Sequence, residues 1–157
     1  MKKVQLLIIL LLFSLSGYSQ VTGFAVINNK LVWENVFVAT QQNIPALIER
    51  NSRLKIIYTD GKMYKGTGTN VLYKCGDNSN VFKKGYNFNF EAELVEGKYR
   101  ITVTNINFNT KAKTTAEKHF IEAGKIKQDE LTIADLSCLQ LYFDRVFSVS
   151  TVLKNKS

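Results

Sequence analysis

Histidine, cysteine and proline are scarce in this sequence. It contains one histidine, His119, two cysteines, Cys75 and Cys138, and a single proline. A metal site needs more ligands than these residues supply at a recognisable spacing, so we expect no metal and no other cofactor. No stretch is dominated by proline, serine or a repeated unit, which argues against a low-complexity or repeat protein.

Long hydrophobic runs are absent except near the amino terminus. There, Lys2 and Lys3 precede an apolar run from Val4 to Phe13 that is interrupted only by Gln5, and small residues stand at Gly17 and Ser19. A membrane-spanning helix needs about 20 apolar residues, roughly twice this run. A buried core helix would need a polar face, which the run lacks. The pattern predicts a cleavable signal peptide over residues 1–19 and a periplasmic or extracellular protein with no transmembrane anchor after cleavage.

The remaining residues, 20–157, are enough for one domain with a hydrophobic core. Acidic residues are outnumbered by basic ones: the formal net charge is +8, and +6 without Lys2 and Lys3. Such an excess favours anionic partners. Because export makes nucleic acid the least suitable of these, we expect an envelope protein or an anionic glycan or lipid, and no nucleic acid. The best candidate basic patch consists of the lysines at 111, 113, 118, 125 and 127, although a spread of lysines is also typical of a solvated surface.

The first half of the predicted domain combines strands with one short helix. Residues 24–39 are rich in valine, phenylalanine and isoleucine on both parities, which predicts a strand covered on both faces, with one turn-like break at 28–30. Asn43 is a capping residue ahead of a predicted helix that ends near Ser52. Two strands should then meet at a turn at Asp60–Gly61, and the second contains Gly66 and Gly68, which suggest a bulge.

The hairpin from Tyr86 to Val103 gives the clearest signal. Apolar and polar residues alternate strictly along both arms, and a two-residue turn at Glu96–Gly97 places apolar residues opposite one another. The same register pairs Glu93 with Arg100 on the wet face. Beyond the hairpin the apolar parity shifts, which predicts a bulge near Asn105. The expected buried residues are Phe88, Phe90, Leu94, Tyr99, Ile101 and Val103.

A long helix is predicted at the carboxyl end, from about Ala134 to Leu153, because apolar residues recur there at helical spacing. Residues 117–123 could form a short helix or a strand. The predicted class is therefore α+β, with element order β-α-β-β-β-β-α and the last helix covering the apolar face of an antiparallel sheet.

With this order, residues 31–37 (Leu-Val-Trp-Glu-Asn-Val-Phe) and 97–106 (Gly-Lys-Tyr-Arg-Ile-Thr-Val-Thr-Asn-Ile) resemble a known family. It is a domain family of unknown function with a TATA-binding-protein-like (TBP-like) fold, found in exported proteins of Gram-negative bacteria. The resemblance extends from about Ile27 to Phe108, with the last helix. It implies a curved antiparallel sheet backed by helices. It brings no catalytic residues, and DNA binding does not follow from the fold name.

Several residues were weighed as functional candidates. Residues 66–69 (Gly-Thr-Gly-Thr) lack the lysine and the strand–loop–helix context of a phosphate-binding loop, so a bulged strand is the better interpretation. His119 has no visible nucleophile or second positioned group and is expected to be a lone surface histidine. Trp33 and the aromatic row at 86, 88 and 90 are expected in the core. Cys75 and Cys138 could form a disulfide or remain two thiols.

We assign no catalytic, cofactor-binding or metal-binding residue from the sequence. The expected function is a non-enzymatic binding or interaction module of the periplasm or cell envelope. Two alternatives stay open. One is an inhibitor-like partner of a secreted enzyme, which would present a sheet edge or loop. The other is an envelope hydrolase whose site would place His119 or Asp77 beside a second polar group.

Overall fold

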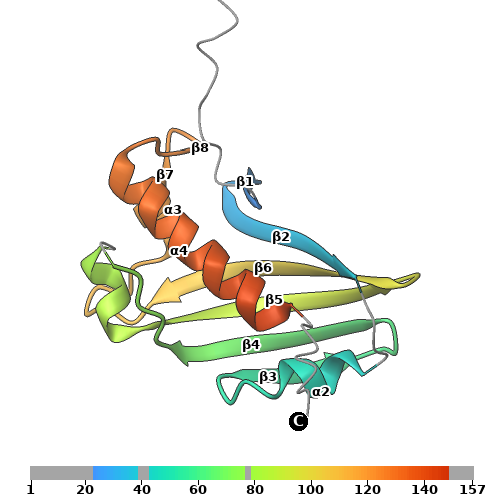
Figure 1. The fold of residues 1–157 in the computed structure, drawn as a ribbon. Coiled ribbons are helices and arrows are strands. Elements are labelled where there is room, and N and C mark those ends of the chain that lie inside the picture. The colour runs from blue at the N-terminus through green and yellow to red at the C-terminus, as the bar shows by residue number, and fades with distance from the viewer. Residues whose placement is uncertain (1–22, 39–42, 77–78, 149–157) are drawn as a thin grey trace, which may run out of the picture.

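A computed structural model describes residues 23–38, 43–76 and 79–148 (Figure 1). Its centre is a curved sheet of six antiparallel strands in the order β1-β2-β6-β5-β4-β3, with helix α4 lying across one face. This confirms the predicted α+β class. The strands are β1 (Phe24–Ile27), β2 (Lys30–Val38), β3 (Leu54–Thr59), β4 (Met63–Val71), β5 (Tyr86–Val95) and β6 (Lys98–Phe108). The other elements are α2 (Ile44–Ile48), η2 (Asn80–Lys84), α3 (Ala116–Phe120), β7 (Ile121–Glu122), β8 (Lys125–Ile126) and α4 (Glu130–Phe147).

The β5–β6 hairpin lies in the middle of the sheet with the predicted register. Leu94 is opposite Tyr99, and Glu93 is opposite Arg100, with which it forms an ion pair at 3.7 Å. Of the six residues expected on the buried face, five are buried and Leu94 is half-buried. The predicted bulge is also present: the pairing shifts by one residue within β6, where Asn105 has a φ of 52°.

Helix α4 covers the apolar face, but its bounds differ from the predicted 134–153. It begins at Glu130, because Asp129 caps it by accepting a hydrogen bond from the Thr132 backbone N–H at 2.9 Å. It ends at Phe147, where Ser148 turns to an extended backbone. Residues 149–153 of the expected helix lie outside the described residues. The face turned to the sheet carries Leu136, Leu139, Phe143 and Phe147, all buried.

The first predicted strand is confirmed in one respect and wrong in another. The turn-like break predicted at 28–30 is present: Asn28 and Asn29, with φ of 50° and 59°, separate β1 from β2. Val36 and Val38 are 51% and 67% exposed, so the expected cover on both faces is absent there. The reason is the layer arrangement: α4 lies on one face only, and the opposite face of the sheet is open at these positions.

The glycines of β4 serve a purpose beyond the one predicted. A Cβ at Gly66 would lie 2.2 Å from Cζ of Phe90, and one at Gly68 would lie 2.4 Å from the Phe88 ring. These glycines therefore admit two aromatic rings against the strand backbone. The kink or bulge predicted near these glycines has two counterparts. The pairing with β3 shifts between Ile56 and Tyr58, opposite Gly66 and Lys65, and the pairing with β5 shifts between Gly68 and Val71, where Asn70 has a φ of 48°.

Other local expectations have mixed outcomes. The predicted turns at Asp60–Gly61 and Glu96–Gly97 join β3 to β4 and β5 to β6. The predicted helix after Asn43 ends at Ile48 rather than near Ser52. The ambiguous segment at 117–123 is helix α3 followed by strand β7.

No helix within the described ranges is long and apolar enough to cross a membrane. The predicted signal peptide lies outside those ranges.

Candidate ligand-binding groove

A groove of about 520 Å³ lies between α2 and the carboxyl-terminal half of α4. Figure 1 shows α2 beside this end of α4, at the β3 edge of the sheet. Asn43 fixes the start of α2 by accepting a hydrogen bond from the Ala46 N–H at 3.1 Å, and proline follows in the first turn. The apolar walls of the groove are formed by Ile44, Leu47, Ile48, Tyr99, Val146 and Phe147.

One polar group in the groove is buried without a hydrogen-bond partner. Tyr142 is only 7% exposed, and its buried hydroxyl forms no hydrogen bond of regular geometry, although the Asn51 side chain lies close enough to affect its pKa. Burial raises the pKa of Tyr142 to about 12, and the nearby Asn51 side chain and the Arg53 charge partly offset this rise. The phenol is thus neutral at ordinary pH and holds an unused donor. A buried polar group left unpaired costs about 1–3 kcal/mol.

A second hydroxyl in the same region is also unpaired. The Tyr86 hydroxyl is buried with no partner, and burial raises its pKa well above the ordinary value. Its ring centroid lies 6.0 Å from that of Tyr142, and the Tyr73 ring lies 5.3 Å from Tyr142 on another side. Tyr73 and Tyr142 both line the groove. Two tyrosines that line the groove, Tyr73 and Tyr142, thus pack against each other, and Tyr86 packs against Tyr142 from outside the groove lining.

Arginine is concentrated around this groove. The chain has seventeen lysines and only four arginines. Arg50 and Arg145 line the groove, and Arg53 is close enough to act on the Tyr142 hydroxyl. Arg50 and Arg145 are exposed, and neither is paired with a carboxylate of the described residues. The fourth, Arg100, lies on the opposite face of the sheet with Glu93. The groove thus combines apolar walls with unpaired guanidinium groups, which suit an anion.

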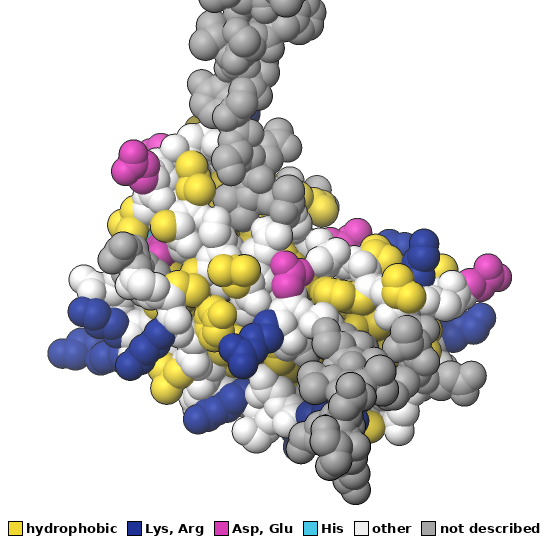
Figure 2. All heavy atoms as spheres, viewed as in Figure 1, with side chains coloured by type: hydrophobic (Ala, Val, Ile, Leu, Met, Phe, Trp, Pro, Cys, Tyr) yellow, Lys and Arg dark blue, Asp and Glu magenta, His cyan; other side chains and the backbone are white. Residues whose placement is uncertain are grey.

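The molecular surface around α4 also combines basic and hydrophobic side chains. Figure 2 shows basic side chains beside hydrophobic ones on the side of the molecule that carries α4. Leu131 and Leu141 on the outer side of this helix are 49% and 59% exposed. Apolar and positively charged surfaces therefore meet along α4.

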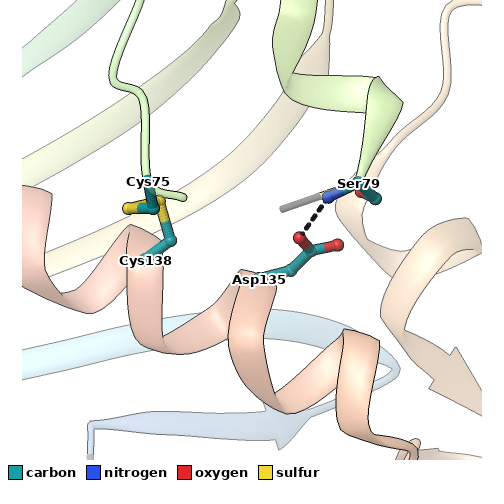
Figure 3. Close-up of a disulfide and its surroundings, with 4 residues drawn as sticks. All are labelled: Cys75, Ser79, Asp135 and Cys138. Atoms are coloured by element: carbon teal, nitrogen blue, oxygen red, sulfur yellow. Dashed lines mark hydrogen bonds between the residues drawn. A yellow bond between two sulfur atoms is a disulfide. The ribbon is translucent and has the colours of Figure 1, made fainter. Parts of the chain in front are cut away.

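His119 is not the lone surface histidine that the sequence suggested. Its Nε2 lies 3.3 Å from Ser79 Oγ and 3.3 Å from Asp135 Oδ2. Asp135 is fully buried, and its Oδ1 accepts a hydrogen bond from the Ser79 backbone N–H at 2.8 Å (Figure 3). The three residues come from α3, α4 and the loop before η2. Sequence reasoning missed the cluster because its members are far apart in the chain and carry no shared motif.

The geometry of this cluster differs from a nucleophile–base pair. In a serine–histidine–aspartate site, serine and aspartate contact opposite nitrogens of the imidazole ring. Here both contact Nε2, so the aspartate does not orient the ring toward the hydroxyl. The cluster instead joins the loop at Ser79 to α4. Asp77, the other residue of the hydrolase alternative, lies outside the described residues.

The two cysteines are paired, which resolves the alternative left open by the sequence. Cys75 and Cys138 form a disulfide, with their Cα atoms 5.8 Å apart (Figure 3). Cys138 lies one helical turn after Asp135 on α4, so the disulfide and the Asp135 hydrogen bond attach the same loop to the same helix. Together they hold the segment that leads from β4 to η2.

The remaining sequence candidates have structural roles. Trp33 is fully buried, with its ring 5.1 Å from that of Phe143, and the aromatic row at 86, 88 and 90 lies beneath α4, as predicted. Residues 66–69 lie inside β4.

The lysines of the predicted basic patch have different surroundings. Lys127 donates a hydrogen bond to the His119 carbonyl at 2.7 Å, while Lys125 lies opposite Glu122 in the β7–β8 hairpin. The described residues contain no group of His, Cys, Asp and Glu side chains that could hold a metal ion.

No local sequence pattern predicts the groove. Arg50 and Arg53 lie far from Arg145 in the chain, and only the packing of α2 against α4 brings them to one place. The available signal was the rarity of arginine among so many lysines.

Comparison with known proteins supports the fold. No family model matches the sequence, and no curated protein matches it. A solved structure of a DUF4468 family protein from Bacteroides ovatus is similar, with 14% identity, a TM-score of 0.50, and coverage of 80% of this chain and 86% of that one. A TBP-like protein from Parabacteroides distasonis has 12% identity, a TM-score of 0.48, and coverage of 78% and 94%. At such identities the likeness concerns the fold alone. At that level, the likeness to the DUF4468 family structure supports the resemblance predicted from the sequence.

Proposed function

We propose that this chain is an exported, non-enzymatic binding module of the periplasm or cell envelope, and that the α2–α4 groove is its binding site. The observation that carries the proposal is the Tyr142 hydroxyl, which is buried in the groove without a partner. A ligand acceptor placed there would satisfy it. The groove volume of about 520 Å³ lies within the usual range for small-molecule sites, about 300–1,000 Å³.

Export is supported by two independent features. The amino-terminal pattern is typical of a cleaved signal peptide. The Cys75–Cys138 disulfide is consistent with an oxidising compartment, where such bonds form and persist.

A binding role without catalysis is supported by the arrangement of the polar groups. Ser79 and Asp135 share one nitrogen of His119, and the groove tyrosines have raised pKa values rather than values near neutrality. A general base or nucleophile works best with a pKa near the working pH. These groups are better suited to hold a ligand than to transfer protons.

A ligand screen with matched variants tests this proposal. The mature protein (residues 20–157) is screened by thermal shift against envelope glycans and lipids, and by pull-down against an envelope extract. Leu47→Glu places a charge in the groove, whereas Val38→Glu places the same charge on the exposed face of β2. We expect the ligand to bind the wild type and Val38→Glu, and to be lost with Leu47→Glu.

Three results would count against the proposal. Equal binding by Leu47→Glu and the wild type would move the site away from the groove. Turnover of a substrate by the purified protein, abolished by Ser79→Ala, would make it an enzyme. Capture of a secreted enzyme that depends on the β3 edge, where Ile57 is 64% exposed, would favour the inhibitor-like alternative.

A further inference from the structure

We infer that the groove binds a free single-chain amphiphile with an anionic oxyacid head group, of which a fatty-acid carboxylate is the simplest member. This inference rests on the proposed function and names the chemistry of its ligand. It follows from three features of the groove: its apolar walls, its arginines and its buried tyrosine hydroxyl.

The walls specify an apolar body for the ligand. Ile44 and Ile48 are buried one turn apart on α2, while Leu47 and Val146 are half-buried and face the groove from the two helices. Covering such surface stabilises a complex by about 25 cal/mol for each Å² removed from water. The volume of about 520 Å³ lies in the lower half of the range for ligand pockets, which favours one hydrocarbon chain over two.

The charged groups specify an anionic head. Arg50, Arg53 and Arg145 approach the groove or its tyrosine end, and none of them forms an ion pair with the described carboxylates. A guanidinium group presents a planar fork of donors that matches an oxyacid in a bidentate geometry, which a lysine ammonium does not. In a chain where lysine outnumbers arginine about fourfold, two of four arginines line one groove and a third acts on its Tyr142, which points to recognition of an oxyacid.

The tyrosine adds a neutral donor at the buried end. Because burial keeps the Tyr142 phenol protonated, its O–H can donate to an oxygen of the head group. Asn51, which also lines the groove, lies next to this hydroxyl and offers a further amide donor. These hydrogen-bond donors favour a ligand head group that accepts hydrogen bonds and disfavour a cationic head group.

Four ligands with the same chain separate these contributions. Dodecanoate, dodecyl phosphate, dodecanol and dodecyltrimethylammonium are titrated as monomers into the mature protein by calorimetry. We expect dodecanoate or dodecyl phosphate to bind at least tenfold more tightly than dodecanol, and the cationic amphiphile to bind more weakly still. Vesicles of phosphatidylglycerol provide the comparison with a two-chain lipid surface.

Single substitutions then test the named residues. Arg145→Gln and Arg50→Gln should each weaken binding of the anionic ligand about tenfold and leave dodecanol unchanged, whereas Arg100→Gln on the opposite face should have no effect. Tyr142→Phe should weaken the anionic ligand several-fold. It should not lower the urea midpoint of the free protein, because the lost hydroxyl has no partner there.

The outcomes distinguish this inference from the proposed function. If dodecanol binds as well as dodecanoate and Leu47→Glu abolishes both, the groove is a binding site but the anionic head is wrong. Binding of vesicles in preference to the monomers would also overturn the choice of a free amphiphile. If no monomer or vesicle binds while another envelope ligand depends on Leu47, the inference fails and the proposed function stands. If nothing depends on Leu47, both fail.

Discussion

The two ends of α4 differ in how their polar groups are paired. Near its amino end, Asp129 caps the helix, Asp135 is hydrogen-bonded to Ser79, and Cys138 is bonded to Cys75. Near its carboxyl end, the Tyr142 hydroxyl has no partner and Arg145 has no ion pair with the described carboxylates. The amino end therefore has these polar groups satisfied within the chain, whereas the carboxyl end leaves Tyr142 and Arg145 without such partners, although Asp144 there accepts a hydrogen bond from Asn35 at 2.7 Å.

The largest expected effect comes from the core that both ends share. Phe90 is fully buried, with its ring 5.2 Å from that of Phe147. Phe90→Ala should lower the free energy of unfolding by about 3–5 kcal/mol, because it leaves a cavity under the helix. Its neighbour Glu91 forms an exposed ion pair with Lys65, so Glu91→Ala should cost less than about 1 kcal/mol. Equal shifts of the urea midpoints would contradict the assignment of the two faces.

The next largest effect concerns the Cys75–Cys138 disulfide, which attaches α4 to the segment after β4. Replacing both cysteines by serine should lower the free energy of unfolding by about 2–4 kcal/mol, since the bridge closes a long loop, with a sequence separation of 63. Urea denaturation measures the loss. Alkylation of the protein before reduction should label neither cysteine, and two labelled cysteines would refute the bridge. Ligand affinity at the groove should change little.

Asp135 gives a smaller and more local test of the same end. Asp135→Ala leaves the Ser79 N–H without its buried acceptor and should cost about 2–3 kcal/mol. Asp144→Ala removes a half-buried hydrogen bond to Asn35, at 2.7 Å, and should cost about 1 kcal/mol. If the two substitutions cost the same in urea denaturation, Asp135 does not anchor the loop.

The buried Tyr142 hydroxyl, near the carboxyl end of α4, should affect how the stability of the protein depends on alkaline pH. The folded pKa of Tyr142, about 12, lies above the unfolded value near 10, so folding favours the neutral phenol. This contribution is complete below pH 10 and is lost as the pH rises from 10 to 12. The wild type should therefore lose more stability over that range than Tyr142→Phe. Identical losses in urea titrations at several pH values would mean that Tyr142 is not buried as described.

Local periodicity accounts for what the sequence predicted well. The β5–β6 register, the Glu93–Arg100 pair and the bulge at Asn105 all follow from alternation over adjacent residues. The stripe along α4 follows from helical spacing. Its amino end was misplaced because Asp129 was not recognised as the cap.

Features that depend on distant packing were missed. The exposure of Val36 and Val38 depends on which face of the sheet α4 covers, and alternation alone cannot determine this. The Ser79–His119–Asp135 cluster and the arginine groove each join segments that are remote in sequence. Composition offered one indirect sign of the groove, the small number of arginines.

The close approach of aromatic rings to β4 has a consequence for which substitutions the strand tolerates. At Gly66 and Gly68 a single added methyl group would overlap the rings of Phe90 and Phe88, so even alanine is excluded without moving the core. Thr67, between them, points to the other face, opposite Asn89 and Lys55. A saturation library across this strand should therefore alternate sharply, with two positions intolerant of every replacement and the residue between them open to many.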